Sequence, residues 1–237
     1  EDFKADFLKE VYYLDTHFKN IDPNFPFVKT DNIQKIASKV TLLAQETLSD
    51  TLALLEHDNL QKALRIMQKA NQIHLAAISY SLLLGQIFKL DMLRIGKNVN
   101  ICNTNGEELF LPAVIKNNDC IIIISYSGEI HNLCSLARTL KGRSVPIIAI
   151  TSLGDNELKK YADVVLHIST REKLYSKIAG YSNENSIKLI LDILYSCYFN
   201  LMYDDNLARR IAISKQAEVG RESTLEIMKE DNTQSGT

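Results

Sequence analysis

A short apolar run that ends in small polar residues constrains the fold of this chain more than any other stretch. Residues 120–124 are apolar without alternation, and Ser125, Tyr126, Ser127 and Gly128 follow directly. A run of this length bounded by turn formers is typical of a strand covered on both faces in a parallel sheet, because a strand with one face in water would alternate. A helical pattern begins next. The sequence therefore predicts a buried strand, a tight turn and a helix in this order.

The hydroxyl groups of this turn would lie at the carboxyl end of the strand, beside the first turn of a helix. The first amide groups of a helix have no partner within it, and the helix dipole is positive there. A phosphate group could therefore be held by Ser125, Ser127 and neighbouring backbone nitrogens. Serine and glycine are also ordinary turn and cap residues that need no ligand, so the turn alone leaves both interpretations open.

Composition narrows the class of protein. With 237 residues, 46% of them hydrophobic and 24% charged, the chain suits one sizeable α/β domain with a helical part. The 27 basic and 29 acidic residues form no basic stripe, so these residues give no electrostatic footprint for nucleic acid. No apolar run approaches the roughly 20 residues that span a bilayer, which predicts no membrane partner.

Four cysteines show no close pairing along the sequence, namely Cys102, Cys120, Cys134 and Cys197. This spacing argues against a disulfide framework or a metal site and favours a reducing cytoplasm. We also expect no cofactor.

The first 56 residues are predicted to form two helices with a break between them. Apolar residues recur at helical spacing in residues 2–19, which predicts an amphipathic helix that needs a partner surface. Asp22, Pro23 and Pro26 then interrupt the pattern, so we expect a linker over residues 20–28. A long helix over residues 31–56 follows, capped by Thr30 or Asp31.

A second helix is expected to start at a capping box formed by Asp58 and Gln61 and to end near Asn71. Beyond it, short strands alternate with helices in the order that builds a parallel sheet by right-handed crossovers. The expected fold is therefore α/β, a doubly wound five-stranded parallel sheet flanked by helices, with further helices at the N-terminus. The expected strands are residues 72–77, 98–103, 119–125, 145–151 and 164–168, and the expected helices are residues 81–95, 107–116, 129–140 and 156–161.

The last long helix, residues 184–203, carries a broad apolar stripe, and Leu189 and Ile193 make its reverse side apolar too. A helix of this kind is usually covered on two sides, here by the sheet and by a second subunit, which predicts a homodimer or tetramer. Asp192 lies within this pattern and is expected to pair with a basic residue or a backbone amide in a structural role. A more polar helix is expected over residues 206–228, and residues 231–237 are expected to be a frayed tail.

The turn resembles a known signature. Residues 125–129 are similar to the Ser-x-Ser-Gly-x-Thr motif of sugar isomerase (SIS) domains, which bind phosphosugars, and the Thr of the motif falls on Ile130. The loop after the first strand resembles the Gly-x-Gly-x-Ser turn of the same family. Ser81 matches its serine, whereas Ala77 and Ser79 replace its glycines. These replacements predict a less open turn, a smaller pocket or a changed ligand.

The resemblance extends over about residues 30–205. Residues 93–96, 150–152, 162–163 and 184–195 are similar to segments of RpiR-type transcriptional regulators, and residues 1–11 resemble the end of their helix-turn-helix domain. The implied organisation is the end of a helix-turn-helix region with its linker in residues 1–28, a SIS domain in residues 29–230 and a tail in residues 231–237. The implied function is that of a sensor domain that binds a phosphosugar effector and modulates DNA binding through a helix-turn-helix domain upstream of this chain.

The expected ligand site combines both turns with the start of the last long helix. Because ligands of open parallel sheets lie outside the carboxyl ends of the strands, the two turns should face each other. Tyr80 would either stack on a sugar face or simply pack. The ligand-binding residues implied are Ser79, Tyr80, Ser81, Ser125, Tyr126, Ser127, Gly128, Glu129, Ile130 and Glu184.

An isomerase of this fold would need a general base, for which Glu184, His131 and Lys177 are the candidates. Each also has a simple structural explanation: Glu184 suits a helix N-terminus, and the other two suit solvent. Since a sensor needs affinity without a tuned base, we expect a sensor rather than an enzyme, with a sugar-phosphate isomerase as the alternative. A third possibility is a domain that only dimerises.

Overall fold

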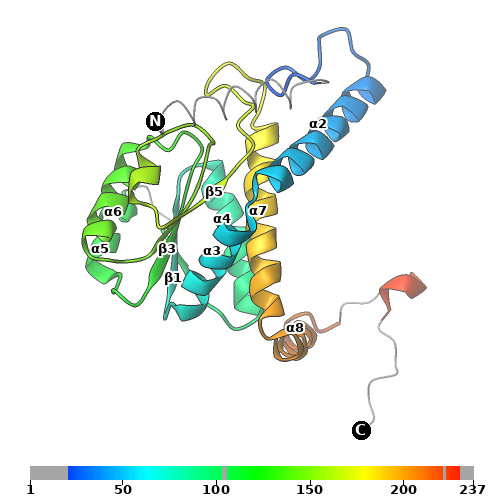
Figure 1. Cartoon of the computed structure of the whole chain (residues 1–237). Helices are drawn as coiled ribbons and strands as arrows, with labels where there is room; N and C mark the ends of the chain where they lie inside the picture. Colours follow the sequence, from blue (N-terminus) through cyan, green and yellow to red (C-terminus); the bar gives the residue numbers. More distant parts are fainter. Residues whose placement is uncertain (1–20, 103–105, 221–222, 230–237) are drawn as a thin grey trace.

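The computed structural model describes residues 21–102, 106–220 and 223–229, and the expected helix over residues 2–19 and the tail over residues 231–237 lie outside them. Five parallel strands form one sheet in the order β2-β1-β3-β4-β5, which confirms the α/β prediction (Figure 1). The strands are β1 Ile73–Ala77, β2 Val99–Ile101, β3 Cys120–Ser125, β4 Ile147–Thr151 and β5 Val164–His167. All residues of β1, β3 and β4 are buried, as expected for strands covered on both faces.

Helices cover both faces of this sheet, as Figure 1 shows. One face packs against α3 (His57–Lys69), α4 (Tyr80–Arg94) and α7 (Tyr181–Asn200). The other packs against α5 (Leu111–Val114), α6 (His131–Gly142) and the 3-10 turn η2 (Leu158–Tyr161). The remaining elements are α2 (Ile33–Leu54), which packs against α7, α8 (Tyr203–Ala217), and the 3-10 turns η1 (Glu107–Leu109) and η3 (Glu226–Met228).

The start of α2 differs from the prediction. Its N-cap is Asn32, whose side chain accepts a hydrogen bond from Lys35 N, and neither Thr30 nor Asp31 has this role. Asp31 instead accepts hydrogen bonds from Val28 N at 3.0 Å and from Lys39 Nζ at 2.5 Å. A carboxylate one residue outside the helix therefore fastens the preceding loop rather than the first helical turn.

The capping box predicted for the start of α3 is wrong, whereas the predicted end near Asn71 is confirmed. The helix begins at His57, its N-cap Glu56 makes no side-chain cap hydrogen bond, and Asp58 lies within the first turn. The C-cap is Ala70, while Asn71 N donates to Asn118 O. The sequence motif was misplaced because an acidic residue is also stabilised inside the first turn by the helix dipole.

Four other predicted helices have different bounds. Residues 107–116 are divided into η1 and α5, since Pro112 lacks an N–H and fits the first turn of a new helix. Residues 156–161 form only the short turn η2. The last long helix starts three residues early and ends at Asn200, and the expected helix over residues 206–228 is divided into α8 and η3.

The apolar reverse side of α7 is covered within the same chain. This helix packs against α2, α3, α4 and α8, and Leu189 and Ile193 are half-buried. The double apolar face therefore does not require a second subunit, and the homodimer remains a prediction. Asp192 is about half-exposed and pairs with Lys188 Nζ at 2.6 Å, which confirms the basic partner but not the buried position.

The contact between α2 and α7 is polar. Thr47 Oγ1 lies 2.9 Å from Ser182 Oγ, and Thr51 Oγ1 donates to Ser186 Oγ at 2.7 Å. All four residues are fully buried, so hydrogen bonds rather than apolar packing fix this helix pair. Among the described residues, no helix combines the length and apolar character required to cross a bilayer.

The packing of α4 on β1 gives a stability prediction. A Cβ atom at Gly85 would lie 2.6 Å from Leu75 Cδ2, and Leu75 is fully buried. We expect Gly85→Ala to lower the free energy of unfolding by about 1 kcal/mol, because overpacking costs about 1–3 kcal/mol and the gain in helix propensity is about 1 kcal/mol.

Gly142→Ala is the control, because a Cβ at this position in α6 meets no atom within 4 Å. It should raise stability by up to about 1 kcal/mol in urea denaturation. An equal gain in the free energy of unfolding in both variants would show that the Leu75 side chain can move aside without cost.

Candidate functional site

The turns that follow β1 and β3 lie side by side at the carboxyl edge of the sheet. Ala77 is paired with Ile124 in the parallel ladder, so the residues after each leave the sheet next to one another. The chain then moves to opposite faces, into α4 after β1 and into α6 after β3. Ligands of open α/β sheets bind where the connections diverge in this way. The geometry thus brings together the two turns that the sequence pattern singled out.

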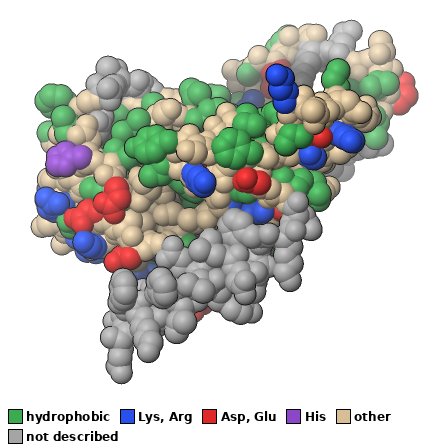
Figure 2. Space-filling view, turned by 90° about the horizontal axis from the view of Figure 1, so that it is seen from above, with side chains coloured by type: hydrophobic (Ala, Val, Ile, Leu, Met, Phe, Trp, Pro, Cys, Tyr) green, Lys and Arg blue, Asp and Glu red, His purple; other side chains and the backbone are tan. Residues whose placement is uncertain are grey.

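Figure 2 looks down on this edge. Hydrophobic side chains and charged side chains of both signs are interspersed over the described part of the face. No single sign of charge dominates what this view shows of the described residues. Anion binding here would therefore depend on local donors rather than on a broad electrostatic field.

The turn after β3 is held by its own hydroxyl groups. Ser125 Oγ accepts a hydrogen bond from Gly128 N at 3.1 Å, and Ser127 Oγ accepts one from Glu129 N at 3.2 Å. A hydroxyl that accepts one bond still has its own hydrogen to donate. Ser127, which is half-buried, can therefore shape the turn and donate to a ligand oxygen, whereas Ser125 is 2% exposed and shapes the turn from inside.

Gly128 cannot be replaced without strain in this turn. Its φ is +68°, and a Cβ would lie 2.1 Å from the side-chain Oδ1 of Asn156. Asn156 is buried, and its Nδ2 donates to Thr151 Oγ1 at the end of β4. Asn156 thus supports the turn from the neighbouring strand, and the sequence pattern gave no sign of this role.

The side chains of Glu129 and Ile130 have structural contacts within the protein. Glu129 Oε1 accepts a hydrogen bond from Glu157 N at 2.8 Å, which fastens the turn to the segment before η2. Ile130 is the N-cap residue of α6, makes no side-chain cap hydrogen bond and packs against the core on the α6 side of the sheet. The residue at the Thr position of the motif therefore serves packing.

The turn after β1 keeps a glycine-like backbone without a glycine. Ser79 has φ 57° and ψ −133°, which is the mirror image of an extended conformation and is open to glycine at no cost. A side chain in such a region costs about 1–3 kcal/mol. Ser79 and Tyr80 are exposed, and Ser81 is half-buried in the first turn of α4. The expectation of a less open turn is therefore wrong at Ser79, because the backbone retains the path that glycine would take.

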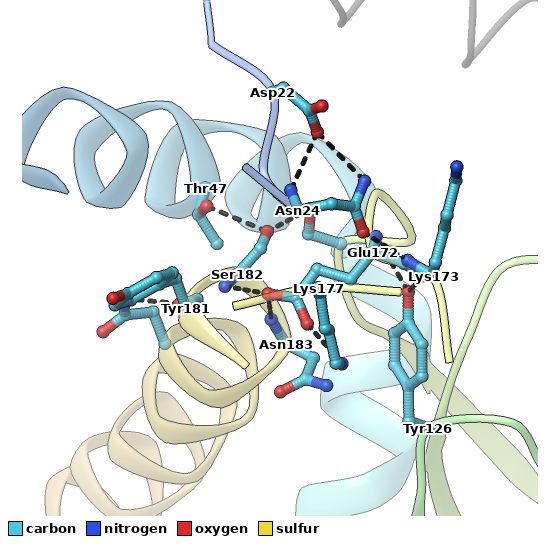
Figure 3. Close-up of polar contacts among 12 residues, drawn as sticks. Asp22, Asn24, Thr47, Tyr126, Glu172, Lys173, Lys177, Tyr181, Ser182 and Asn183 are labelled. Atoms are coloured by element: carbon cyan, nitrogen blue, oxygen red, sulfur yellow. Dashed lines mark hydrogen bonds and ion pairs between the residues drawn. The ribbon is translucent and has the colours of Figure 1, made fainter. Parts of the chain in front are cut away.

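Tyr126 is directed into the protein and not toward the rim where Tyr80 lies. Its hydroxyl donates to Glu172 O at 2.6 Å and accepts from Glu172 N at 3.1 Å (Figure 3). Burial raises the pKa of Tyr126 to about 12, so the phenol is neutral at physiological pH. Lys177 Nζ lies 5.4 Å from the centre of the ring. The phenol therefore joins the turn to residues 171–178.

Glu172 occupies the N-terminus of α7, the position that the sequence assigned to Glu184. Its carboxylate is fully buried and accepts hydrogen bonds from Ser182 N and Asn183 N. It also forms an ion pair with Lys177 Nζ at 2.8 Å. Lys177 is consequently not the exposed residue expected from the sequence. Nothing in the sequence marks Glu172, because the amides that it meets lie ten and eleven residues along the chain.

Glu184 is left in an unfavourable electrostatic position. Burial raises its pKa, the Glu172 carboxylate raises it further, and Lys177 opposes the rise. Its carboxylate folds back over Gly180, where a Cβ would lie 2.5 Å from Oε1. A carboxylate with a raised pKa can act as a general base or acid, whereas His131 is exposed at the start of α6.

A separate cavity of about 410 Å³ lies along β1 and β2 and contains none of the predicted ligand residues. Buried His74 lines it, with Nε2 3.4 Å from Asp119 Oδ2, and burial lowers the pKa of this histidine. Among the described residues, no cluster of three or more histidine, cysteine or acidic side chains could hold a metal ion.

Comparison with known proteins gives one family match and several structural relatives. The family model described as the SIS domain matches residues 66–195. The NanR protein of Vibrio vulnificus, solved in complex with ManNAc-6P, is similar with a TM-score of 0.70 and 17% identity over 80% of this chain and 70% of that one.

Two further solved structures have the same fold. The sugar isomerase domain of an RpiR transcription factor from Sphaerobacter thermophilus has a TM-score of 0.67 and 16% identity over 77% of this chain and 99% of that one. Phosphoheptose isomerase GmhA from Neisseria gonorrhoeae has a TM-score of 0.61 and 14% identity over 71% of this chain and all of that one. Structural relatives thus include both regulators and isomerases.

The strained turn after β1 yields a prediction. Ser79→Gly should raise the free energy of unfolding by about 1 kcal/mol, because glycine adopts positive φ without strain. Ser81→Gly, two residues later in α4, should instead lower it by up to about 1 kcal/mol. Thermal or urea denaturation of both variants measures this, and a loss at Ser79 would mean that its side chain makes a contact worth more than the strain.

The raised pKa of Glu184 predicts a pH-dependent effect. A carboxyl whose folded pKa lies above its ordinary value of 4.5 costs stability as the pH rises through the folded pKa, and costs none below the ordinary value. Glu184→Gln should therefore be more stable than the wild type at pH 7, and the difference should vanish near pH 4. Urea unfolding at both pH values checks this, and a gain of equal size at pH 4 would assign the effect to packing rather than charge.

Proposed function

Because this chain belongs to the SIS domain family, we propose that it binds a phosphorylated sugar or a related carbohydrate derivative at the turns after β1 and β3. The observation that carries this proposal is the adjacency of two hydroxyl-bearing turns at the point where the chain connections diverge. Ser125 and Ser127 carry hydroxyl groups at the end of β3 and in the turn after it, and Ser81 carries one in the first turn of α4, the helix that follows β1.

Two helix N-termini meet at this edge and favour an anionic ligand. The N-cap residues of α4 and α6, Ser79 and Ile130, make no side-chain cap hydrogen bond. The first amides of each helix point outward from its N-terminus, and the positive ends of both helix dipoles favour negative charge. A phosphate group placed between the two turns would satisfy both helices, while a sugar ring would extend toward Tyr80, which is about half-exposed.

We further propose that the chain is the effector-sensing part of a transcriptional regulator, with the phosphosugar modulating DNA binding through a helix-turn-helix domain. Support comes from the likeness to the NanR and RpiR proteins and from the resemblance of residues 1–11 to the end of a helix-turn-helix domain. A sensor requires affinity and a route for the signal but no tuned acid or base. The second subunit of the proposed homodimer or tetramer would provide the matching half of a two-fold DNA contact.

A sugar-phosphate isomerase is the alternative, and one observation favours it. Glu184 has a raised pKa, which suits a general base that removes a proton from the carbon next to a carbonyl. Exchange of the C2 proton of a sugar phosphate for deuterium, followed by NMR, separates the two functions. Exchange that is abolished in Glu184→Gln would establish the enzyme, and binding without exchange would support the sensor.

The binding proposal is tested by a thermal-shift series. N-acetylmannosamine 6-phosphate, glucose 6-phosphate and their unphosphorylated parents would be compared, since a ligand at 100 times its Kd adds about 2.7 kcal/mol of stability. We expect Ser127→Ala to weaken binding by about ten- to a hundredfold, because a hydrogen bond to a charged group contributes about 1.5–3 kcal/mol.

Ser38→Ala is the matched control, because Ser38 lies exposed on α2 and, within the described part of the chain, its hydroxyl donates to Gln34 O of the same helix. It should leave both the melting temperature and the ligand response unchanged. If no sugar phosphate shifts the melting temperature of the wild type, the domain is instead a scaffold that binds other copies of itself.

A further inference from the structure

We propose that residues 171–178 form a clasp that couples the ligand turn after β3 to residues 21–24, the segment that leads into α2. The proposal rests on the proposed function in one respect, namely that a ligand at the turn would supply the signal. The clasp itself is a set of hydrogen bonds between three segments that lie far apart in the sequence (Figure 3).

One end of the clasp is hydrogen-bonded to the turn after β3. Tyr126 makes two hydrogen bonds with the backbone of a single residue, Glu172, through its donor and its acceptor. The turn backbone at this position is also fixed, since Ser152 N donates to Tyr126 O at 3.2 Å. A movement of the turn therefore shifts residue 172 or breaks two partly buried hydrogen bonds.

The other end of the clasp is hydrogen-bonded to residues 21–24. Asn24 is 7% exposed, and its side-chain Oδ1 accepts a hydrogen bond from Lys173 N at 2.7 Å. Its backbone oxygen accepts another from Ile178 N at 2.9 Å. Asn24 thus binds both ends of the loop, and residue 173 directly follows the residue that Tyr126 holds.

Two side chains keep these partners in place. Asp22 accepts hydrogen bonds from Asn24 N at 2.8 Å and from Asn24 Nδ2 at 3.0 Å, which orients the amide so that its oxygen faces Lys173 (Figure 3). Arg171, whose side chain is 1% exposed, donates to Ile21 O at 3.2 Å and to Glu46 at 3.1 Å. Arg171 of the loop therefore links residues 21–24 to α2.

The base of the loop is anchored on α7. The buried Glu172 carboxylate accepts from the first amides of α7 and pairs with Lys177, so residue 172 links the turn, the loop and the helix. A ligand that favours one position of the turn would bias the whole set of bonds. Such coupling is reciprocal, so a change at residue 24 must also alter the turn.

The test begins without ligand, by amide hydrogen exchange on the whole chain. Tyr126→Phe should speed exchange at the amides of Lys173, Ile178, Asn24 and Phe25 by about three- to tenfold, the effect of losing a hydrogen bond of about 0.5–1.5 kcal/mol from a local opening. Tyr161→Phe is the control, since its hydroxyl bonds Glu157 and Arg138 and not residues 171–178.

A second variant acts from the other end. Asn24→Ala should speed exchange at the amides of Gly128 and Ser152, although neither contacts Asn24. Faster exchange at the far end in both variants, with no change at the amides of Asn24, Lys173 and Ile178 in Tyr161→Phe, establishes the coupling. Changes confined to the neighbourhood of each substitution would overturn it.

The ligand arm separates this inference from the proposed function. N-acetylmannosamine 6-phosphate is the probe, and it should alter exchange at the amides of residues 24 and 25 in the wild type but not in Asn24→Ala. A lack of response to this probe in the wild type would count against the proposed function only, because the ligand-free comparison decides the clasp by itself.

Discussion

The hydrogen-bonded ladder between β1 and β3 is the constraint on which the rest of this structure depends. It aligns Ala77 with Ile124, and the two strands then send their chains to opposite faces of the sheet. A slip of one residue would turn Leu75 out of the core that it shares with α4 and α7 and would separate the two polar turns. The same register therefore secures both the hydrophobic core and the candidate site.

The two ends of the molecule are held by different forces. Around the sheet, the buried isoleucine and leucine side chains make apolar contacts, which have no preferred direction. Stability there depends on how completely these side chains fill the core. Between α2, α7 and residues 171–178, buried hydroxyl, amide and carboxylate groups are fixed by hydrogen bonds. A buried polar network whose members are all satisfied makes the structure rigid and specifies one arrangement. The proposed clasp lies in this polar region.

Two unfavourable features occur at the same edge of the sheet. Ser79 keeps a backbone conformation that suits glycine, and Glu184 remains beside the buried Glu172 carboxylate, which raises its pKa. Strain and perturbed ionisation of this kind cluster at sites that bind or react, because the surrounding fold can sustain a local cost in exchange for a preorganised geometry. Their position beside the turns after β1 and β3, and beside α7, is consistent with one site.

The sequence by itself determined the elements, and the tertiary structure decided their partners. The uninterrupted apolar run over residues 120–124 and the alternation of strands and helices were enough to specify a buried parallel sheet and to place the serine turn at its carboxyl edge, because periodicity and turn chemistry are local properties. The caps of α2 and α3, the in-chain cover of α7 and the bonds of Tyr126 and Asn24 to residues 172 and 173 were not predictable. The caps are local, but neighbouring residues competed for each of them, so local chemistry did not choose among the candidates. The bonds of Tyr126 and Asn24 join residues 46 and 149 positions apart, whose positions are set only when the helices pack on the sheet.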